Sequence, residues 1–218
     1  MSAGTGDRAR SPETWLFDFD GTLVDSVELI LDSFRHATGT VLGAVPADEV
    51  LLAGVGTPLR EQMESLDPAR ADELVAVYRE HNLRRHADLL RSYPGVDAML
   101  AGLRRRGRVL GIVTSKMRDA VELGMRHVPL GRFDVIVTVE DTVRHKPDPA
   151  PVLHGLALLG AAAESAVYVG DAPYDLRAGR GAGVATAAAM WGTAFAPAVL
   201  RAERPDRELQ HPEEALRW

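Results

Sequence analysis

The feature that most constrains the fold is an alternation of short apolar runs with longer segments of helical composition. The apolar runs are rich in β-branched residues and lie at 15–17, 109–113, 135–138, 166–169 and 184–189. Segments of helical composition separate them, at 96–106, 118–125, 148–159 and 174–179. Strands that alternate with helices form a parallel sheet covered by helices on both faces. The sequence therefore predicts an α/β fold.

Residues 25–90 interrupt the alternation, because they have helical composition almost throughout. In the clearest segment, 71–90, Leu74 and Tyr78 recur at helical spacing. We therefore expect a small helical cap at 25–90, inserted after the first strand. The rest is expected to form a Rossmann-like core with a parallel sheet at 14–24 and 91–200, flanked by tails at 1–13 and 201–218.

Composition excludes several classes of function. The net charge of −6 leaves no basic surplus with which to bind nucleic acid. The absence of cysteine excludes disulfides, thiol catalysis and cysteine-based zinc sites. No segment reaches the roughly 18 apolar residues that a membrane span requires, and residues 1–13 lack the apolar region of a secretory signal. We therefore expect no membrane association and a cytoplasmic location.

Polar residues follow the apolar runs at the points where strands are expected to end. Asp18 and Asp20 follow the first run, Thr114 follows the second and Asp171 follows the fourth. Ligands of an open parallel sheet bind at the carboxyl ends of its strands. Lys146 lies in a loop that could reach the same edge. The spacing therefore predicts one site that contains carboxylates, a hydroxyl group and a lysine.

This set of side chains suits the transfer of a phosphoryl group. Clustered carboxylates repel one another unless a hard cation such as Mg²⁺ binds between them, and Mg²⁺ prefers carboxylates together with water and substrate phosphate. A cation, a lysine and a hydroxyl group stabilise the charge on a transferred phosphoryl group. One carboxylate can attack phosphorus, and a second can act as general acid and base.

Four segments resemble the motifs of the haloacid dehalogenase superfamily, in the order found in that superfamily. DFDGTLVDS at 18–26 resembles the first motif, TSK at 114–116 the second, KP at 146–147 the third, and the segment from Gly170 to Asp175 the fourth. The helical insertion resembles the small cap of this superfamily. Other runs in the cap and core resemble its bacterial pyrophosphatases, which are close relatives of phosphoglycolate phosphatases.

The resemblance implies roles for the acidic residues. Asp18 would be the nucleophile and a metal ligand, and Asp20 would be the general acid and base. The backbone carbonyl of Asp20 and the carboxylate of Asp171 would also bind Mg²⁺. Asp175 would support the metal shell.

The resemblance also implies which residues bind phosphate. Thr114 and the backbone at Ser115 would hold the phosphoryl group, and Lys146 would orient the nucleophile and neutralise the phosphate. In the cap, a glycine-rich loop at 54–59 is a candidate substrate loop through Gly56 and Thr57. A plain turn between helices is an equally good interpretation of this loop.

The expected function is Mg²⁺-dependent hydrolysis of a small phosphate compound, with pyrophosphate or phosphoglycolate first. A sugar-phosphate phosphatase or a phosphomutase similar to β-phosphoglucomutase is an alternative on the same fold. A non-catalytic phosphate-binding regulator is an alternative of another class. The expected partner is thus a small phosphorylated metabolite or pyrophosphate.

Overall fold

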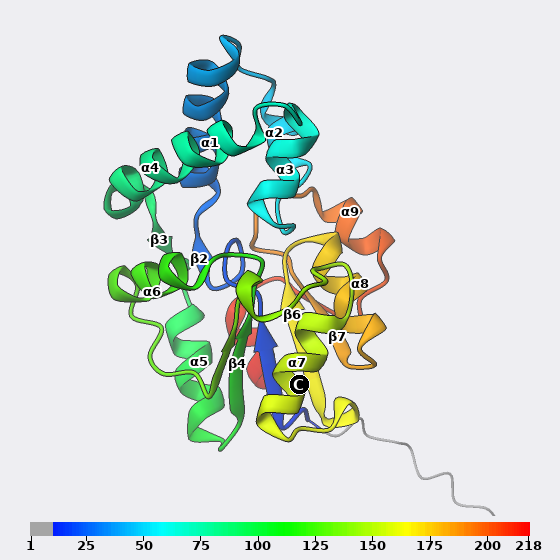
Figure 1. The fold of residues 1–218 in the computed structure, drawn as a ribbon. Coiled ribbons are helices and arrows are strands. Elements are labelled where there is room, and N and C mark those ends of the chain that lie inside the picture. The colour runs from blue at the N-terminus through cyan, green and yellow to red at the C-terminus, as the bar shows by residue number, and fades with distance from the viewer. Residues whose placement is uncertain (1–10) are drawn as a thin grey trace, which may run out of the picture.

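The computed structural model describes residues 11–218 and shows an α/β fold built on a six-stranded sheet (Figure 1). The strand order is β5-β4-β1-β6-β7-β8, and every pairing is parallel. This confirms the predicted fold class. The strands are β1 (Thr14–Phe17), β4 (Val109–Val113), β5 (Val135–Val137), β6 (Ala166–Gly170), β7 (Ala185–Ala189) and β8 (Arg207–Leu209).

Helices cover both faces of the sheet. Side chains of β1 alternate between the faces, as a strand requires: Trp15 and Phe17 join one apolar cluster and Leu16 joins another. The first cluster also contains side chains of α5 (Val96–Arg105) and α6 (Arg118–His127). The second contains side chains of α7 (Ala150–Leu159) and α8 (Pro173–Gly181). Because β1 is buried on both faces, its sequence is a continuous apolar run.

A helical unit lies beyond one end of the sheet in Figure 1. It comprises α1 (Val27–Leu42), α2 (Asp48–Leu52), α3 (Leu59–Leu66) and α4 (Ala71–Leu89). The unit has an apolar cluster of its own, in which the rings of Phe34 and Tyr78 pack edge to face with centroids 5.0 Å apart. These helices fall inside the predicted insertion, while the division of the chain into a core domain and a cap domain stays a prediction.

A short two-stranded sheet joins the helical unit to the core. β2 (Val24–Asp25) pairs antiparallel with β3 (Arg91–Ser92). The chain therefore leaves the core and returns to it through two adjacent segments. Neither strand was expected, because two residues are too short to show an apolar period.

The structure corrects the predicted tail at 201–218. After α9 (Pro197–Ala202), the chain forms β8, which pairs parallel with β7, and then the 3₁₀ helix η3 (Pro212–Arg217). The ring of Trp218 packs edge to face on Trp15, with centroids 5.5 Å apart. Charged residues are interspersed with the apolar ones in this segment, so the sequence shows no clear strand or helix pattern there.

Of the tail predicted at 1–13, residues 1–10 lie outside the described residues. Two further 3₁₀ helices are η1 (Val139–Asp141) and η2 (Ala163–Ser165).

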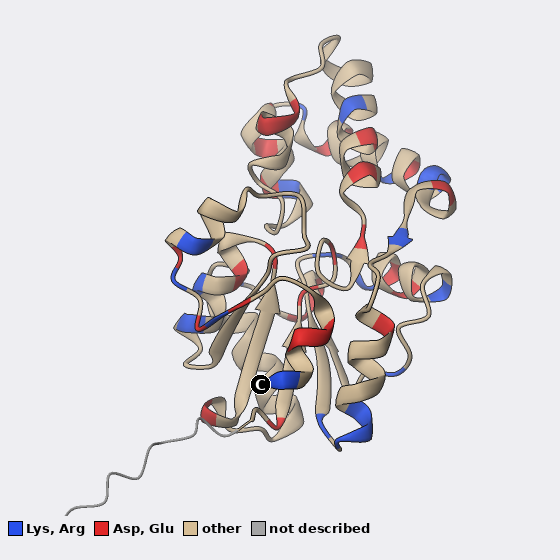
Figure 2. Cartoon of the chain, turned by 180° about the vertical axis from the view of Figure 1, so that it is seen from behind, with Lys and Arg blue, Asp and Glu red and all other residues tan. Residues whose placement is uncertain are grey.

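Acidic and basic residues are interspersed over the helices of the core and of the helical unit, as Figure 2 shows. Several are paired; for example, Arg35 contacts Asp48 at 2.6 Å. Mixed surface charge of this kind is ordinary for a globular domain. None of the helices between residues 11 and 218 has an apolar stretch of the length that a bilayer requires.

We predict that Leu209→Ala lowers the free energy of unfolding by about 2–5 kcal/mol, because Leu209 is 4% exposed in β8 and packs into the core. Chemical denaturation of both proteins measures this change. Leu158→Ala is the matched control, because Leu158 is 60% exposed. Equal effects of the two substitutions would show that β8 does not belong to the cooperative core.

Candidate active site

Three neighbouring strands deliver the predicted polar residues to one edge of the sheet. Asp18 follows β1, Thr114 follows β4 and Asp171 follows β6, and the sheet places β1 between the other two. After β1, the chain adds β4 and β5 on one side of β1 and then returns to add β6 on the other side. This reversal of strand order is the place where open α/β sheets bind ligands.

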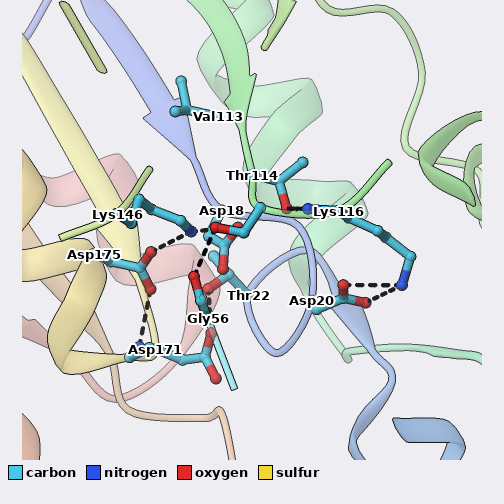
Figure 3. Close-up of polar contacts among 12 residues, drawn as sticks. Asp18, Asp20, Thr22, Gly56, Val113, Thr114, Lys116, Lys146, Asp171 and Asp175 are labelled. Carbon is cyan, nitrogen blue, oxygen red and sulfur yellow. Dashed lines mark hydrogen bonds and ion pairs between the residues drawn. The ribbon is translucent and has the colours of Figure 1, made fainter. Parts of the chain in front are cut away.

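Asp18 lies in a buried ion-pair cluster. The Nζ atom of Lys146 is 3.0 Å from Oδ1 of Asp18 and 2.6 Å from Oδ1 of Asp175, and Figure 3 shows all three side chains converging. Lys146 is only 2% exposed. Burial alone would lower the pKa of Lys146, but the charges of Asp175 and Asp18 outweigh burial and raise it. The lysine is therefore a fixed positive charge beside the carboxylate of Asp18.

The cluster carries more negative than positive charge. Carboxylate oxygens of Asp18, Asp171 and Asp175 lie within 4.8 Å of one another, and all three residues are buried. Burial, and then the charges of Asp175 and Asp18, raise the pKa of Asp171 well above its usual value. Burial also raises the pKa of Asp18 to about 7, against the opposing effect of Lys146. A single lysine does not balance three carboxylates, so the donor set fits a hard divalent cation.

The loop after β1 fixes the position of Asp171. The hydroxyl of Thr22 donates a hydrogen bond to Oδ1 of Asp171 at 2.9 Å. Gly21 has φ +76°, and a Cβ atom there would lie 2.0 Å from Oδ2 of Asp171. Only glycine permits both this backbone conformation and this close approach. The position of Asp171 in the fourth motif therefore requires a glycine at position 21 in the first motif.

Asp175 is held by the core around it. Its Oδ2 atom accepts a hydrogen bond from the amide of Ala172 at 3.0 Å. The hydroxyl of Tyr168 lies 3.2 Å from Oδ1, which also accepts from Lys146. Both carboxylate oxygens thus have partners within the protein. The contribution of Tyr168 could not be predicted from the sequence, because a buried tyrosine in a strand is usually a packing residue.

A second ion pair lies apart from this cluster. Nζ of Lys116 donates to both carboxylate oxygens of Asp20, at 2.7 and 2.9 Å (Figure 3). The backbone amide of Lys116 is 3.3 Å from the hydroxyl of Thr114. Lys116 was not among the predicted site residues. Its place in the same strand-end loop, two residues after Thr114, is the signal that could have identified it.

The candidate loop of the helical unit contacts the core. The hydroxyl of Ser115 donates to the carbonyl of Gly56 at 2.7 Å, while the hydroxyl of Thr57 bonds within its own loop, to Gly54 at 2.8 Å. A second contact comes from Tyr174, whose hydroxyl donates to the carbonyl of Ala53 at 2.9 Å.

A cavity of about 470 Å³ lies between the helical unit and the carboxyl ends of the strands. Its wall includes Asp18, Asp20, Thr114 and Asp171 from the core, together with Gly56 and Thr57 from the helical unit. Lys146 and Asp175 do not line it, so they stand behind the acids that do. The structure thus brings the predicted residues together in two layers, one facing the cavity and one supporting it.

Comparisons with known proteins identify the family. The family model described as "Haloacid dehalogenase-like hydrolase" matches residues 15–189. "Pyrophosphatase PpaX" of Bacillus velezensis is 37% identical over 92% of this chain and 93% of its own length. "Putative pyrophosphatase PpaX" of Clostridium perfringens is 39% identical over 92% of this chain and 94% of its own length.

Solved structures agree with these sequence matches. The structure of a "putative phosphoglycolate phosphatase" from Lactobacillus plantarum superposes with a TM-score of 0.84 and is 26% identical, covering 95% of this chain and 99% of the other. The resemblance that the four motifs indicated is therefore confirmed. The chain belongs to the haloacid dehalogenase-like hydrolase family of enzymes.

Proposed function

We propose that the chain is a Mg²⁺-dependent phosphohydrolase that forms an aspartyl-phosphate on Asp18 and then hydrolyses it. The observation that carries this proposal is the environment of Asp18. The carboxylate lines the cavity, has a buried lysine at 3.0 Å behind it, and has the carboxylate of Asp171 beside it. A simple phosphate-binding protein would not gain from an acid at the point where the anion binds.

Mg²⁺ would be held by the carboxylates of Asp18 and Asp171 and by the backbone carbonyl of Asp20. Asp175 would support these ligands from behind, because it does not line the cavity and its oxygens accept hydrogen bonds from Lys146 and Ala172. When bound, the ion would neutralise the excess negative charge and polarise the phosphate.

The side chains of the site would divide the reaction between them. Oδ of Asp18 attacks phosphorus in line with the leaving oxygen, while Lys146 favours the ionised form of the carboxylate and orients it. Thr114 and the backbone at Ser115 hold the non-reacting phosphoryl oxygens. Asp20 gives a proton to the leaving oxygen and later accepts one from the water that attacks the aspartyl-phosphate.

Pyrophosphate is the first candidate substrate and phosphoglycolate the second. The pyrophosphatase names of relatives that match almost end to end support the former, and the solved structure similar to this one supports the latter. Sugar phosphates come next, and a phosphomutase would act on these. A cytoplasmic location and the absence of a nucleic-acid partner stay predictions from the sequence.

We predict that Asp18→Asn lowers the turnover of every phosphate substrate by at least about a thousandfold, because the amide is a poor nucleophile. Phosphate release measures turnover, and thermal unfolding checks the fold. Asp97→Asn is the matched control, because Asp97 is exposed in the first turn of α5, outside the site. Acid quenching should trap a phosphorylated wild-type protein and none in Asp18→Asn. Turnover of Asp18→Asn at the wild-type rate would refute the mechanism.

We predict that Mg²⁺ stabilises the protein as well as activating it. At a hundredfold excess over its Kd, binding to the folded state alone adds about 2.7 kcal/mol to the free energy of unfolding. Thermal unfolding with and without Mg²⁺ measures this shift in the absence of substrate. Asp171→Asn should lose most of the shift, whereas Asp97→Asn should keep it. Full turnover in excess EDTA would contradict the metal assignment.

A panel of phosphate compounds tests which of these candidate substrates the protein prefers. We expect the highest kcat/KM for pyrophosphate or phosphoglycolate, with hexose phosphates lower. Conversion of a hexose 1-phosphate to its 6-phosphate without release of phosphate would identify a mutase. Binding of phosphate without turnover of any compound in the panel would identify a regulator.

A further inference from the structure

The two lysines of this chain occupy special positions. Of the 25 basic residues, only Lys116 and Lys146 are lysines, and the rest are arginines. Both lysines are paired with aspartates of the site, Lys146 with Asp18 and Lys116 with Asp20. An ammonium group is a compact charge on a flexible stem, whereas a guanidinium group is a rigid planar fork. The function proposed above uses Lys146 and leaves Lys116 unexplained.

The contact between Lys116 and Asp20 conflicts with the role proposed for Asp20. Both carboxylate oxygens accept a hydrogen bond from the same ammonium group, at 2.7 and 2.9 Å. Each oxygen keeps a second lone pair, but the contact holds both oxygens of Asp20 toward the ammonium group. A second anion that attracted Lys116 would free the carboxylate of Asp20 to turn toward a leaving oxygen.

The cavity offers a place for such an anion. Lys116 and Asp20 both line it, with side chains that are 12% and 18% exposed. Arg79 of α4 and Arg126 of α6 line the same cavity, and neither forms an ion pair with any residue between 11 and 218. The cavity volume of about 470 Å³ leaves room beyond a single phosphoryl group. The cavity wall thus contains cationic side chains besides Lys116.

A second feature of the cavity wall is the buried side chain of His86, whose hydrogen-bonding groups are unpaired among the described residues. It is 1% exposed, lines the cavity, and has no hydrogen-bond partner for either ring nitrogen among the described residues. Burial and the nearby charge of Lys116 lower the pKa of His86 to about 4, so the ring is neutral near pH 7. Buried polar atoms are normally paired, so this part of the wall is also incomplete without a ligand.

We propose that Lys116 binds a second anionic group carried on the leaving side of the substrate, and that this binding releases Asp20 toward the leaving oxygen. The substrate class is then a phosphate compound with a second phosphoryl or carboxylate group close to the scissile bond. The inference rests on the proposed function and deepens it, since it links selection of the substrate to the freeing of the general acid. Phosphate esters with an uncharged leaving group would not displace Lys116 from Asp20.

The test compares substrates that differ in the leaving group. kcat/KM is measured for pyrophosphate, phosphoglycolate and p-nitrophenyl phosphate, with wild type, Lys116→Met and Lys116→Arg. The quantity compared is a ratio, the kcat/KM for the better doubly anionic substrate divided by the kcat/KM for p-nitrophenyl phosphate. We expect Lys116→Met to reduce this ratio by at least about tenfold, because the substitution removes a charge-assisted hydrogen bond. Lys116→Arg should restore part of this ratio, because it restores the charge. Which of the two anionic substrates loses more identifies the second group as phosphoryl or carboxylate.

A control and a second variant keep the test decisive. Arg144→Met removes an exposed cation that does not line the cavity, and the ratio should stay within twofold of wild type. Lys116→Gln replaces Lys116→Met if the latter does not fold. A ratio unchanged in the Lys116 variants, or equal losses on all substrates, would overturn the inference. Asp18→Asn separates this failure from failure of the proposed function, because turnover by that variant would contradict the latter alone.

Discussion

The structure around the site depends on one electrostatic constraint, the burial of three carboxylates beside a single lysine. Buried charges are tolerated only when they are paired or bind a cation. Lys146 holds Asp18 and Asp175 together, and the third carboxylate, Asp171, forms no ion pair with any residue between 11 and 218. The parallel sheet makes this possible, because neighbouring strands end at one edge and the loops that follow provide amides and hydroxyls.

The helical unit contributes the other half of the cavity. It has its own apolar cluster and is joined to the core by the β2–β3 pair. Its polar contacts with the site loops include those from Ser115 to Gly56 and from Tyr174 to Ala53. The cavity wall therefore combines acids of the core with side chains of the helical unit.

The sequence predicted most of the core because its strands are buried on both faces and appear as apolar runs. It failed where elements are too short or too charged to show a pattern. The two residues of β2, the three of β8 and the 3₁₀ helix at the C-terminus become ordered through partners far away in the sequence, such as Trp15 for Trp218.

By itself, the sequence determined the fold class, the family, and the residues that meet at the strand ends, because motif order and strand period are local properties. Only the tertiary structure decided how charge is distributed among those residues. The pairing of Lys116 with Asp20, the close approach of Gly21 to Asp171 and the hydrogen bond from Thr22 join residues that are distant in the chain. Distances between such residues set the balance of burial and charge, and no sequence pattern records that balance.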